Sequence, residues 1–134
     1  MIVEKTATAP IAAEEDVVRV RQAVRAQAVE AGFSLVDQTK LVTAASEIAR
    51  NTLEYGGGGT VKLETLRNGT KKGVRLTFVD QGPGIADLKL AMQDGYTSGG
   101  GLGLGLSGAK RLSSEFDIQS APGKGTTVTL ARWK

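Results

Sequence analysis

The stretch that decides the fold class is L-V-D-Q-T-K-L-V-T-A-A-S-E-I-A-R-N-T-L-E-Y-G-G-G-G-T-V-K-L-E-T-L, residues 35–66, because its hydrophobic period changes partway along. Up to Tyr55 the apolar residues recur at the spacing of a helix. Four consecutive glycines, 56–59, then end the helix, and the residues from 60 onward alternate as in a strand. A long helix that leads directly into a strand indicates an α/β protein built in layers. The helical stripe comprises Leu41, Ala44, Ala45, Ile48, Thr52 (or Leu53 beside it) and Tyr55.

The same period analysis divides the rest of the chain into elements. It predicts helices at Glu14–Ala31, Leu35–Tyr55 and Leu104–Leu112, and a short amphipathic segment at Ile85–Met92. It predicts strands at Ile2–Thr8, Thr60–Leu66, Val74–Val79, Phe116–Ser120 and Thr126–Ala131, with Pro10 ending the first. Ser34 and Asp37 are typical of a capping pair. We expect one domain, residues 1–134: a two-layer α/β (α+β) sandwich with helices on one face of a mixed, mostly antiparallel sheet.

The composition is that of an ordinary globular protein, but two absences exclude whole classes of chemistry. The 134 residues are 40% hydrophobic and 23% charged, and include no cysteine and no histidine. Without cysteine there is no disulfide, thiolate nucleophile or cysteine-held metal. Without histidine there is no Ser-His-Asp triad, imidazole base or phosphohistidine. The chemistry must therefore use carboxylates, amides, hydroxyls, lysine, arginine, backbone N–H groups or a bound metal.

The charge is mildly positive and scattered along the chain. The net charge is +3, the densest basic groups are Lys71–Lys72 and Lys110–Arg111, and aromatic residues make up 4%. A nucleic-acid surface needs a basic stripe or a stacking platform, so no nucleic-acid partner is expected. No apolar run approaches the roughly 18 residues of a membrane span, and the N-terminus lacks the apolar core of a signal peptide. We therefore expect a soluble, cytoplasmic protein.

Glu47 and Asn51 lie four residues apart and project from one side of the second predicted helix. A lone pair of this kind usually lies on a solvated helix face, where Glu47 could pair with Arg50 or Lys40. Here the small and apolar neighbours place the pair beside the buried stripe. A carboxylate and an amide also supply oxygen ligands for a hard cation and a proton acceptor for an activated hydroxyl. The pair is therefore a candidate site for this chemistry.

The sequence D-Q-G-P-G-I that begins at Asp80 follows a predicted strand and has two interpretations. Its residue types are typical of a turn. Alternatively, Asp80 accepts a hydrogen bond from an exocyclic amine such as that of adenine. Gly82 and Gly84 would then let the backbone approach a flat ring, with Ile85 packing on its face. Thr126 follows a predicted hairpin turn and could reach the same site.

The densest glycine segment, S-G-G-G-L-G-L-G-L at 98–106, does not fit the common nucleotide motifs. Gly103, Gly105 and Gly108 match G-x-G-x-x-G, but no hydrophobic strand precedes them, as a dinucleotide site requires. The Walker pattern fails because alanine follows Gly108, and a protein-kinase glycine loop would lack its histidine partner. A glycine-rich segment leading into a helix still favours phosphate, through free N–H groups and the helix dipole. A flexible loop is the alternative.

In this order, the pieces resemble the GHKL ATP-binding superfamily, whose members share the Bergerat fold. Glu47 to Asn51 is similar to its N box, Asp80-x-Gly82-x-Gly84 to its G1 box, Gly101-x-Gly103-x-Gly105 to its G2 box, and Thr126 to its late threonine. Over nearly the whole chain the sequence further resembles the small serine/threonine switch kinases of the bacterial stressosome. That closer resemblance is carried by residues 46–51, 55–59, 80–85 and 110–116 and by the Arg132-Trp133 ending.

The resemblance implies ATP and Mg²⁺ as cofactors and assigns roles to these residues. Glu47 would be catalytic and would orient or deprotonate the acceptor hydroxyl, while Asn51 would bind the Mg²⁺ that bridges the ATP phosphates. Asp80 would bind adenine in a pocket lined by Gly82, Gly84 and Ile85, with Thr126 beside it. Residues 86–105, with Gly101, Gly103 and Gly105, would form a lid over the phosphates. The cation that offsets charge on the transferring phosphate could be Lys89, Lys110 or Arg50.

The resemblance also implies partners. Such kinases phosphorylate serine or threonine on STAS-domain scaffold or antagonist proteins and then leave to activate a downstream partner, commonly a PP2C-type phosphatase or a cyclase. An anti-sigma-factor-like protein, in which ATP gates binding and catalysis is minor, is the alternative. A detached histidine-kinase catalytic domain is a third possibility, which would need a phospho-accepting histidine on another protein.

Overall fold

The computed structural model describes residues 1–93 and 105–134. Within these ranges the elements follow the predicted order of a strand, two long helices, two strands, two short helices and two strands. Their bounds are β1 (Ile2–Ile11), α1 (Glu14–Glu30), α2 (Leu35–Glu54), β2 (Gly59–Asn68), β3 (Lys71–Asp80), α3 (Leu88–Ala91), α4 (Leu106–Arg111), β4 (Glu115–Ser120) and β5 (Thr126–Trp133).

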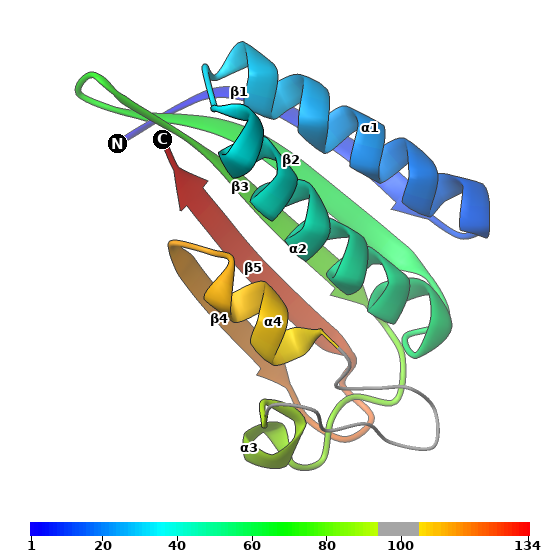
Figure 1. Cartoon of the computed structure of the whole chain (residues 1–134). Helices are drawn as coiled ribbons and strands as arrows, with labels where there is room; N and C mark the ends of the chain where they lie inside the picture. Colours follow the sequence, from blue (N-terminus) through cyan, green and yellow to red (C-terminus); the bar gives the residue numbers. More distant parts are fainter. Residues whose placement is uncertain (94–104) are drawn as a thin grey trace.

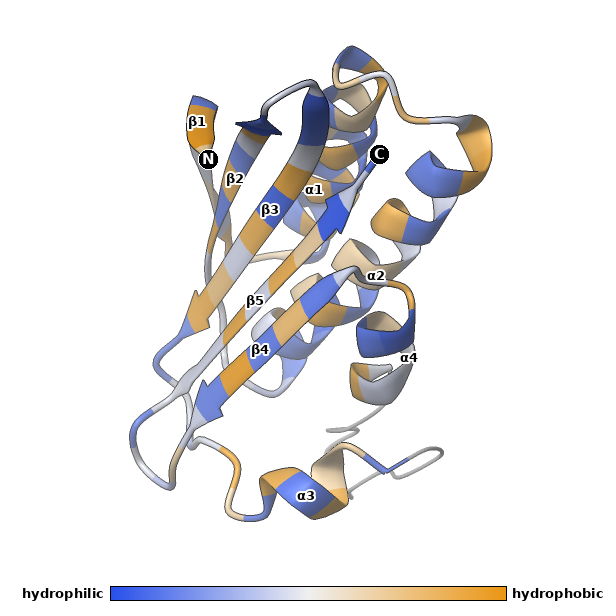
Figure 2. Cartoon of the chain, turned by 90° about the vertical axis from the view of Figure 1, so that its left-hand side faces the viewer, coloured by the Kyte–Doolittle hydropathy of each residue, from blue (hydrophilic) through white to orange (hydrophobic). Residues whose placement is uncertain are grey.

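The five strands form one sheet in the order β1-β2-β3-β5-β4. The helices α1, α2 and α4 cover one face of this sheet and leave the other open (Figures 1 and 2). Each strand pair in the described ranges is antiparallel, so the mixed sheet we expected is antiparallel there throughout. β4 and β5 are antiparallel because a tight turn joins them, and β5 then lies between β4 and β3 in the sheet. The expected two-layer fold is confirmed.

Local signals explain where α1 and α2 begin and end. Ser34 Oγ accepts a hydrogen bond of 3.1 Å from the Asp37 backbone N–H, which confirms the predicted cap of α2. Gly32 lies between the helices at φ +86°, a conformation that favours glycine. Both helices turn their apolar stripes to the sheet, and Phe78, Ile11, Leu41, Ile48, Leu76 and Leu130 are among the largest fully buried side chains. This core holds α2 in a fixed position above β3.

Hydrogen bonds from two arginines connect the helices to the sheet and neighbouring strands to each other. Arg132 on β5 donates to Asp37 Oδ1 at 2.8 Å and to the Leu112 carbonyl at 2.7 Å, which joins the start of α2 to the end of α4. On the open face, the Arg75 guanidinium donates twice to the buried Glu64 carboxylate, at 2.8 and 3.1 Å, across neighbouring strands. Paired in this way, the charges are satisfied where burial would otherwise be costly.

Some element boundaries differ from the predictions. β1 continues through Pro10 to Ile11, because β1 is an edge strand and a proline without an N–H is tolerated there. The amphipathic segment at 85–92 is helical only over α3, whose start Asp87 caps by accepting from the Leu90 N–H. In the part of the chain that the structure describes, no helix is both long and apolar enough to cross a membrane.

Candidate active site

Asp80 is the last residue of β3, and the residue is 7% exposed. Burial raises the pKa of this carboxyl above its ordinary value, because desolvation penalises the charged form. The backbone N–H groups of Gly82 and Thr126 hydrogen bond to the carboxylate and lower its pKa in part. Asp80 is therefore a buried hydrogen-bond acceptor with two of its contacts fixed by backbone.

Glycines in the loop after Asp80, and at the end of α2 beside it, lie where a Cβ would overlap neighbouring atoms. A Cβ at Gly56 would overlap the Asp80 carboxylate, and a Cβ at Gly82 would lie 2.7 Å from Gly56 Cα. Gly84, at φ +76°, lies against the Ala121 carbonyl, and a Cβ there would overlap it. At Gly82 and Gly84 the close neighbours are backbone atoms of Gly56 and Ala121, so the expected approach of a flat ring to these two glycines stays a prediction. Gly56, from the four-glycine run, is a neighbour that our sequence analysis did not assign.

A narrow pocket opens beside Asp80. Its free volume is about 20 Å³, room for one water molecule, so a purine base could enter only if the lining side chains moved apart. The lining mixes apolar side chains that could cover a ring with polar groups that could orient it. It comprises Ile48, Asn51, Thr52, Tyr55, Phe78, Asp80, Ile85, Leu106, Thr126 and Val128. The structure thus brings together four residues predicted for this site: Asn51, Asp80, Ile85 and Thr126.

Two hydroxyl groups that the sequence analysis did not single out hold the loop after Asp80. Tyr55 donates from its hydroxyl to the Gly84 carbonyl at 2.9 Å. Ser120, at the end of β4, accepts from the Ile85 N–H at 2.8 Å and also contacts the Thr126 hydroxyl at 2.8 Å. The sequence places Tyr55 in the helical stripe without indicating its contact with Gly84. Ser120 lies opposite Thr126 in register, a relation that is visible only once β4 and β5 are paired.

Glu47 and Asn51 occupy adjacent turns of α2 but have different neighbours. The Glu47 side chain lies against Gly105, which starts α4 at φ +79°. Asn51 lies one turn further along α2 and faces the Asp80 pocket. On α2, therefore, the Glu47 carboxylate lies beside the start of α4, and the Asn51 amide lies at the pocket.

Of the three side chains expected to offset charge on the transferring phosphate, Arg50 already pairs with carboxylates of α1 and α2. Its Nη1 lies 3.4 Å from Glu54 Oε1 and 3.6 Å from Glu14 Oε1. Lys89 lies in α3 and Lys110 in the last turn of α4. Gly101 and Gly103, with most of the expected lid, lie outside the described residues, so Gly105 is the described part of that glycine motif.

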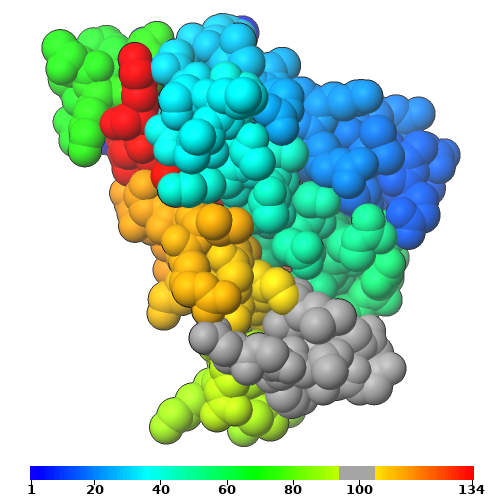
Figure 3. All heavy atoms as spheres, in the orientation of Figure 1, coloured from blue at the N-terminus to red at the C-terminus, as the bar shows by residue number. Residues whose placement is uncertain are grey.

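A second hollow lies between α1 and α2, and Glu47 forms part of its lining. Its free volume is about 690 Å³, and both helices lie side by side on this face of the molecule (Figure 3). It is lined by Arg21, Gln22, Arg25 and Ala26 of α1 and by Val42, Thr43, Ser46 and Glu47 of α2. We call this hollow the α1–α2 groove. Glu47 therefore has neighbours on two sides, Gly105 and the groove.

Comparison with known proteins identifies the family. Residues 36–134 match the family described as histidine kinase-, DNA gyrase B-, and HSP90-like ATPases. The chain is 45% identical over 123 residues to the serine/threonine-protein kinase RsbT of Bacillus subtilis (strain 168), covering 92% of each chain. It is 27% identical over 119 residues to an anti-sigma F factor of Thermoanaerobacter sp. (strain X514), covering 84% of this chain and 82% of the relative.

A solved structure agrees with these matches. The structure of RsbU and RsbW domains from Mycobacterium tuberculosis aligns with a TM-score of 0.63 and 25% identity, covering 96% of this chain and 31% of that longer chain. The expected superfamily, fold and enzyme class are thereby confirmed. The chain belongs to the family of histidine kinase-, DNA gyrase B- and HSP90-like ATPases and, within it, to the RsbT-like serine/threonine-protein kinases.

Proposed function

We propose that this chain transfers the γ-phosphate of Mg-ATP to a serine or threonine hydroxyl of a STAS-domain protein. One observation carries the proposal. A single helix, α2, bears both a carboxylate at the α1–α2 groove, Glu47, and an amide at the Asp80 pocket, Asn51. A kinase needs this division, because the acceptor hydroxyl and the nucleotide approach from different sides and meet at the transferring phosphate.

The donor set around Asp80 fits an adenine nucleotide. The buried carboxylate can accept from an exocyclic amine, and Ile85 and Phe78 offer apolar surface to a ring. Glycines at 56, 82 and 84 keep side chains out of the loop beside it. In our proposal, Asp80 and Thr126 orient the base, and Gly82 and Gly84 let the backbone pass close to it.

Asn51 would hold the metal, because an amide oxygen is a suitable ligand for Mg²⁺. When bound, Mg²⁺ would neutralise charge on the ATP phosphates. No cluster of three or more acidic residues suited to a metal occurs in residues 1–93 and 105–134, so the proposal names Asn51 alone.

Glu47 would accept the proton of the acceptor hydroxyl, or orient that hydroxyl for in-line attack. The α1–α2 groove gives an acceptor segment a path to this carboxylate. Arg21 and Arg25 lie on the groove and have no carboxylate partner among the described residues, so an acidic segment would complement them. Arg25 donates instead to the amide oxygen of Gln38 at 3.3 Å.

The proposal extends to partner switching, in which the kinase leaves the phosphorylated STAS scaffold and activates a PP2C-type phosphatase or a cyclase. Similarity to RsbT supports this, over nearly the whole chain. Similarity to an anti-sigma F factor supports a second candidate, an ATP-gated binding protein with little catalysis.

One experiment separates the two candidates. A purified STAS protein is incubated with this chain and Mg-ATP, and its mass is then measured. We expect one new phosphoserine or phosphothreonine, absent with Glu47→Gln. A stable complex without phosphate on the STAS protein would contradict the kinase proposal and favour the ATP-gated binding protein.

A further inference from the structure

The hydroxyl of Ser120 makes three hydrogen bonds, each at 2.8 Å, behind the candidate adenine pocket. Its oxygen accepts from the Ile85 N–H, donates to the Gly125 carbonyl, and contacts the Thr126 hydroxyl. Ser120 does not itself line the pocket, whereas Thr126 does. The serine therefore acts on the pocket only through its neighbours.

Counting protons fixes the direction of the bond between the two hydroxyls. A serine hydroxyl has one proton to donate. Because a carbonyl oxygen only accepts, the proton of Ser120 belongs to the Gly125 carbonyl. The contact between Ser120 and Thr126 can then be a hydrogen bond only if Thr126 donates. Any other arrangement leaves two oxygens 2.8 Å apart with no proton between them.

We infer that Ser120 is a positioning residue that makes Thr126 a pure hydrogen-bond acceptor toward the pocket, and so favours a purine that carries a 6-amino group over one with a 6-oxo group. This inference rests on the proposed function, which places a nucleotide base in the pocket. With its proton committed to Ser120, the Thr126 oxygen keeps only lone pairs for a ligand.

Thr126 then has the same polarity as its partner in the sheet, Asp80. The two residues face each other in register across β3 and β5, and both line the pocket. An exocyclic amine has two protons to donate, directly or through a bridging water. A 6-oxo group would instead face two acceptors, Asp80 and Thr126. Buried oxygens would then have no hydrogen-bond donor, which lowers the affinity for that purine.

The test compares dissociation constants for ATP and for inosine triphosphate, which has an oxygen in place of the 6-amino group. Calorimetric titrations use wild type, Ser120→Ala, Ser120→Thr and Ser114→Ala. In Ser120→Ala the Thr126 hydroxyl is free to turn and donate, so we expect the preference for ATP to fall about three- to tenfold. Ser120→Thr, which keeps a hydroxyl, should restore the preference.

Ser114→Ala is the matched control. It removes a hydroxyl at the other end of β4, where Ser114 accepts from the Trp133 N–H, and it should leave the preference unchanged. Ser120→Ala should also change nothing further in a Thr126→Val background, because no hydroxyl is left to orient. If Ser120→Ala is too unstable to measure, Thr126→Val alone serves as the test, because it removes the hydroxyl that Ser120 orients and should lower the preference for ATP in the same way.

An equal loss of affinity for both nucleotides in Ser120→Ala would overturn the inference, because a merely structural role lowers both and leaves their ratio unchanged. An additional fall in the ratio on adding Ser120→Ala to Thr126→Val would overturn it too. Failure of the wild type to bind ATP would be a different result, since it would overturn the proposed function itself.

Discussion

Gly105 lies so close to Glu47 that a Cβ at position 105 would be 2.5 Å from Glu47 Oε2 and 2.8 Å from Glu47 Cβ. The backbone at the start of α4 is therefore in direct contact with the proposed catalytic carboxylate. A side chain at this position would displace the carboxylate, and the φ of +79° adds strain for any residue other than glycine.

We predict that Gly105→Ala lowers the rate of phosphoryl transfer by about tenfold or more, because a displaced carboxylate no longer meets the acceptor hydroxyl. Gly108→Ala, three residues along α4, is the control. A Cβ there has no neighbour within 4 Å, and alanine favours a helix. Transfer rates measured with radiolabelled ATP check both variants. Equal rates for the two would argue against any role of the Gly105–Glu47 contact.

Glu47→Gln tests the carboxylate itself. Glutamine keeps the size of the side chain but cannot accept the hydroxyl proton, so the transfer rate should fall about 10²- to 10⁴-fold. ATP affinity should change little, because Glu47 is not part of the pocket lining. Transfer assays and nucleotide titrations measure the two effects separately. A variant that transfers at the wild-type rate would show that Glu47 is not the base.

The contact between Gly56 and Asp80 predicts a variant defective in nucleotide binding. Gly56→Ala puts a methyl group where the Asp80 carboxylate lies, and we expect ATP affinity to fall at least about tenfold. Gly57→Asn is the control, because a Cβ at Gly57 meets nothing within 4 Å and asparagine tolerates its φ of +74°. Calorimetric titration of both variants is the measurement. If Gly56→Ala bound ATP with wild-type affinity, Asp80 would not take part in nucleotide binding.

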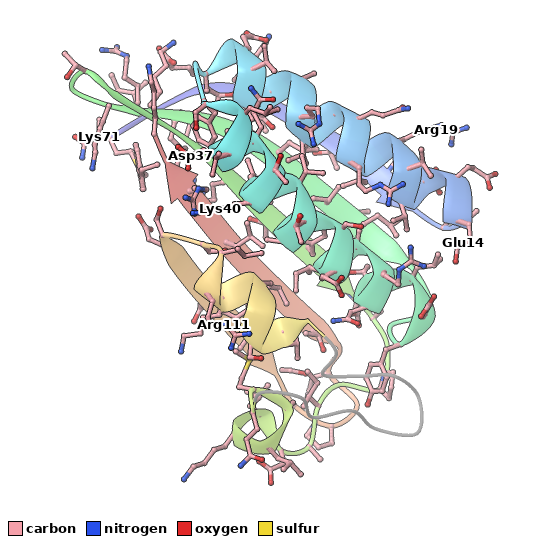
Figure 4. The ribbon with its side chains drawn as sticks, viewed as in Figure 1. Glu14, Arg19, Asp37, Lys40, Lys71 and Arg111 are labelled. Atoms are coloured by element: carbon pink, nitrogen blue, oxygen red, sulfur yellow. The ribbon has the colours of Figure 1, made fainter. Side chains whose placement is uncertain are left out.

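Charge reversal in the α1–α2 groove tests the proposed path of the acceptor. Arg21→Glu and Arg25→Glu should raise the KM for an acidic acceptor protein and leave the turnover rate at saturation nearly unchanged, since charge complementarity acts mainly on association. Arg19→Glu is the control. Arg19 lies on the same helix, pairs with Asp16 at 2.9 Å and points away from α2 (Figure 4). If all three variants behaved alike, the effect would be one of net charge and not of the groove.

The ion pair between Glu64 and Arg75 predicts sensitivity to acid. The hydrogen bonds from Arg75 hold the pKa of the Glu64 carboxyl below its ordinary value of 4.5. Below pH 4.5 the unfolded chain therefore binds more protons at this position than the folded chain, so stability falls as the pH falls. At pH values above 4.5 the ion pair contributes its full stabilisation to the folded chain.

Urea unfolding at several pH values measures this contribution. Glu64→Gln should lower the free energy of unfolding near neutral pH. On acidification, the free energy of unfolding of this variant should fall by less than that of the wild type. Glu15→Gln, at an exposed site on α1, should follow the wild-type pH dependence. Identical pH profiles for wild type and Glu64→Gln would show that other carboxylates govern acid unfolding.

Local signals were sufficient for the elements but not for their contacts. The period change at the four glycines and the Ser34 cap correctly predicted α2 and β2, because both depend on neighbouring residues. Contacts such as Gly56 with Asp80 or Ser120 with Thr126 join residues that are distant along the chain or become partners only once the strands pair. The predicted fold class, with its mostly antiparallel sheet, is confirmed, but the sequence did not show that each described strand pair is antiparallel, since strand direction depends on which strands become neighbours.

The register that sets Asp80 opposite Thr126 has a consequence for how such a chain can change in length. Inserting or deleting one residue inside β3 or β5 would turn the following side chains to the other face. Asp80 and Thr126, the pair proposed to recognise the base, would then be separated although the sheet could still form. The turn at Gly69 and Thr70 joins β2 to β3 at the end of these strands that is far from Asp80, so it can gain or lose residues without moving Asp80 or Thr126. Natural variation in chain length should therefore be found in that turn and be absent from β3 and β5.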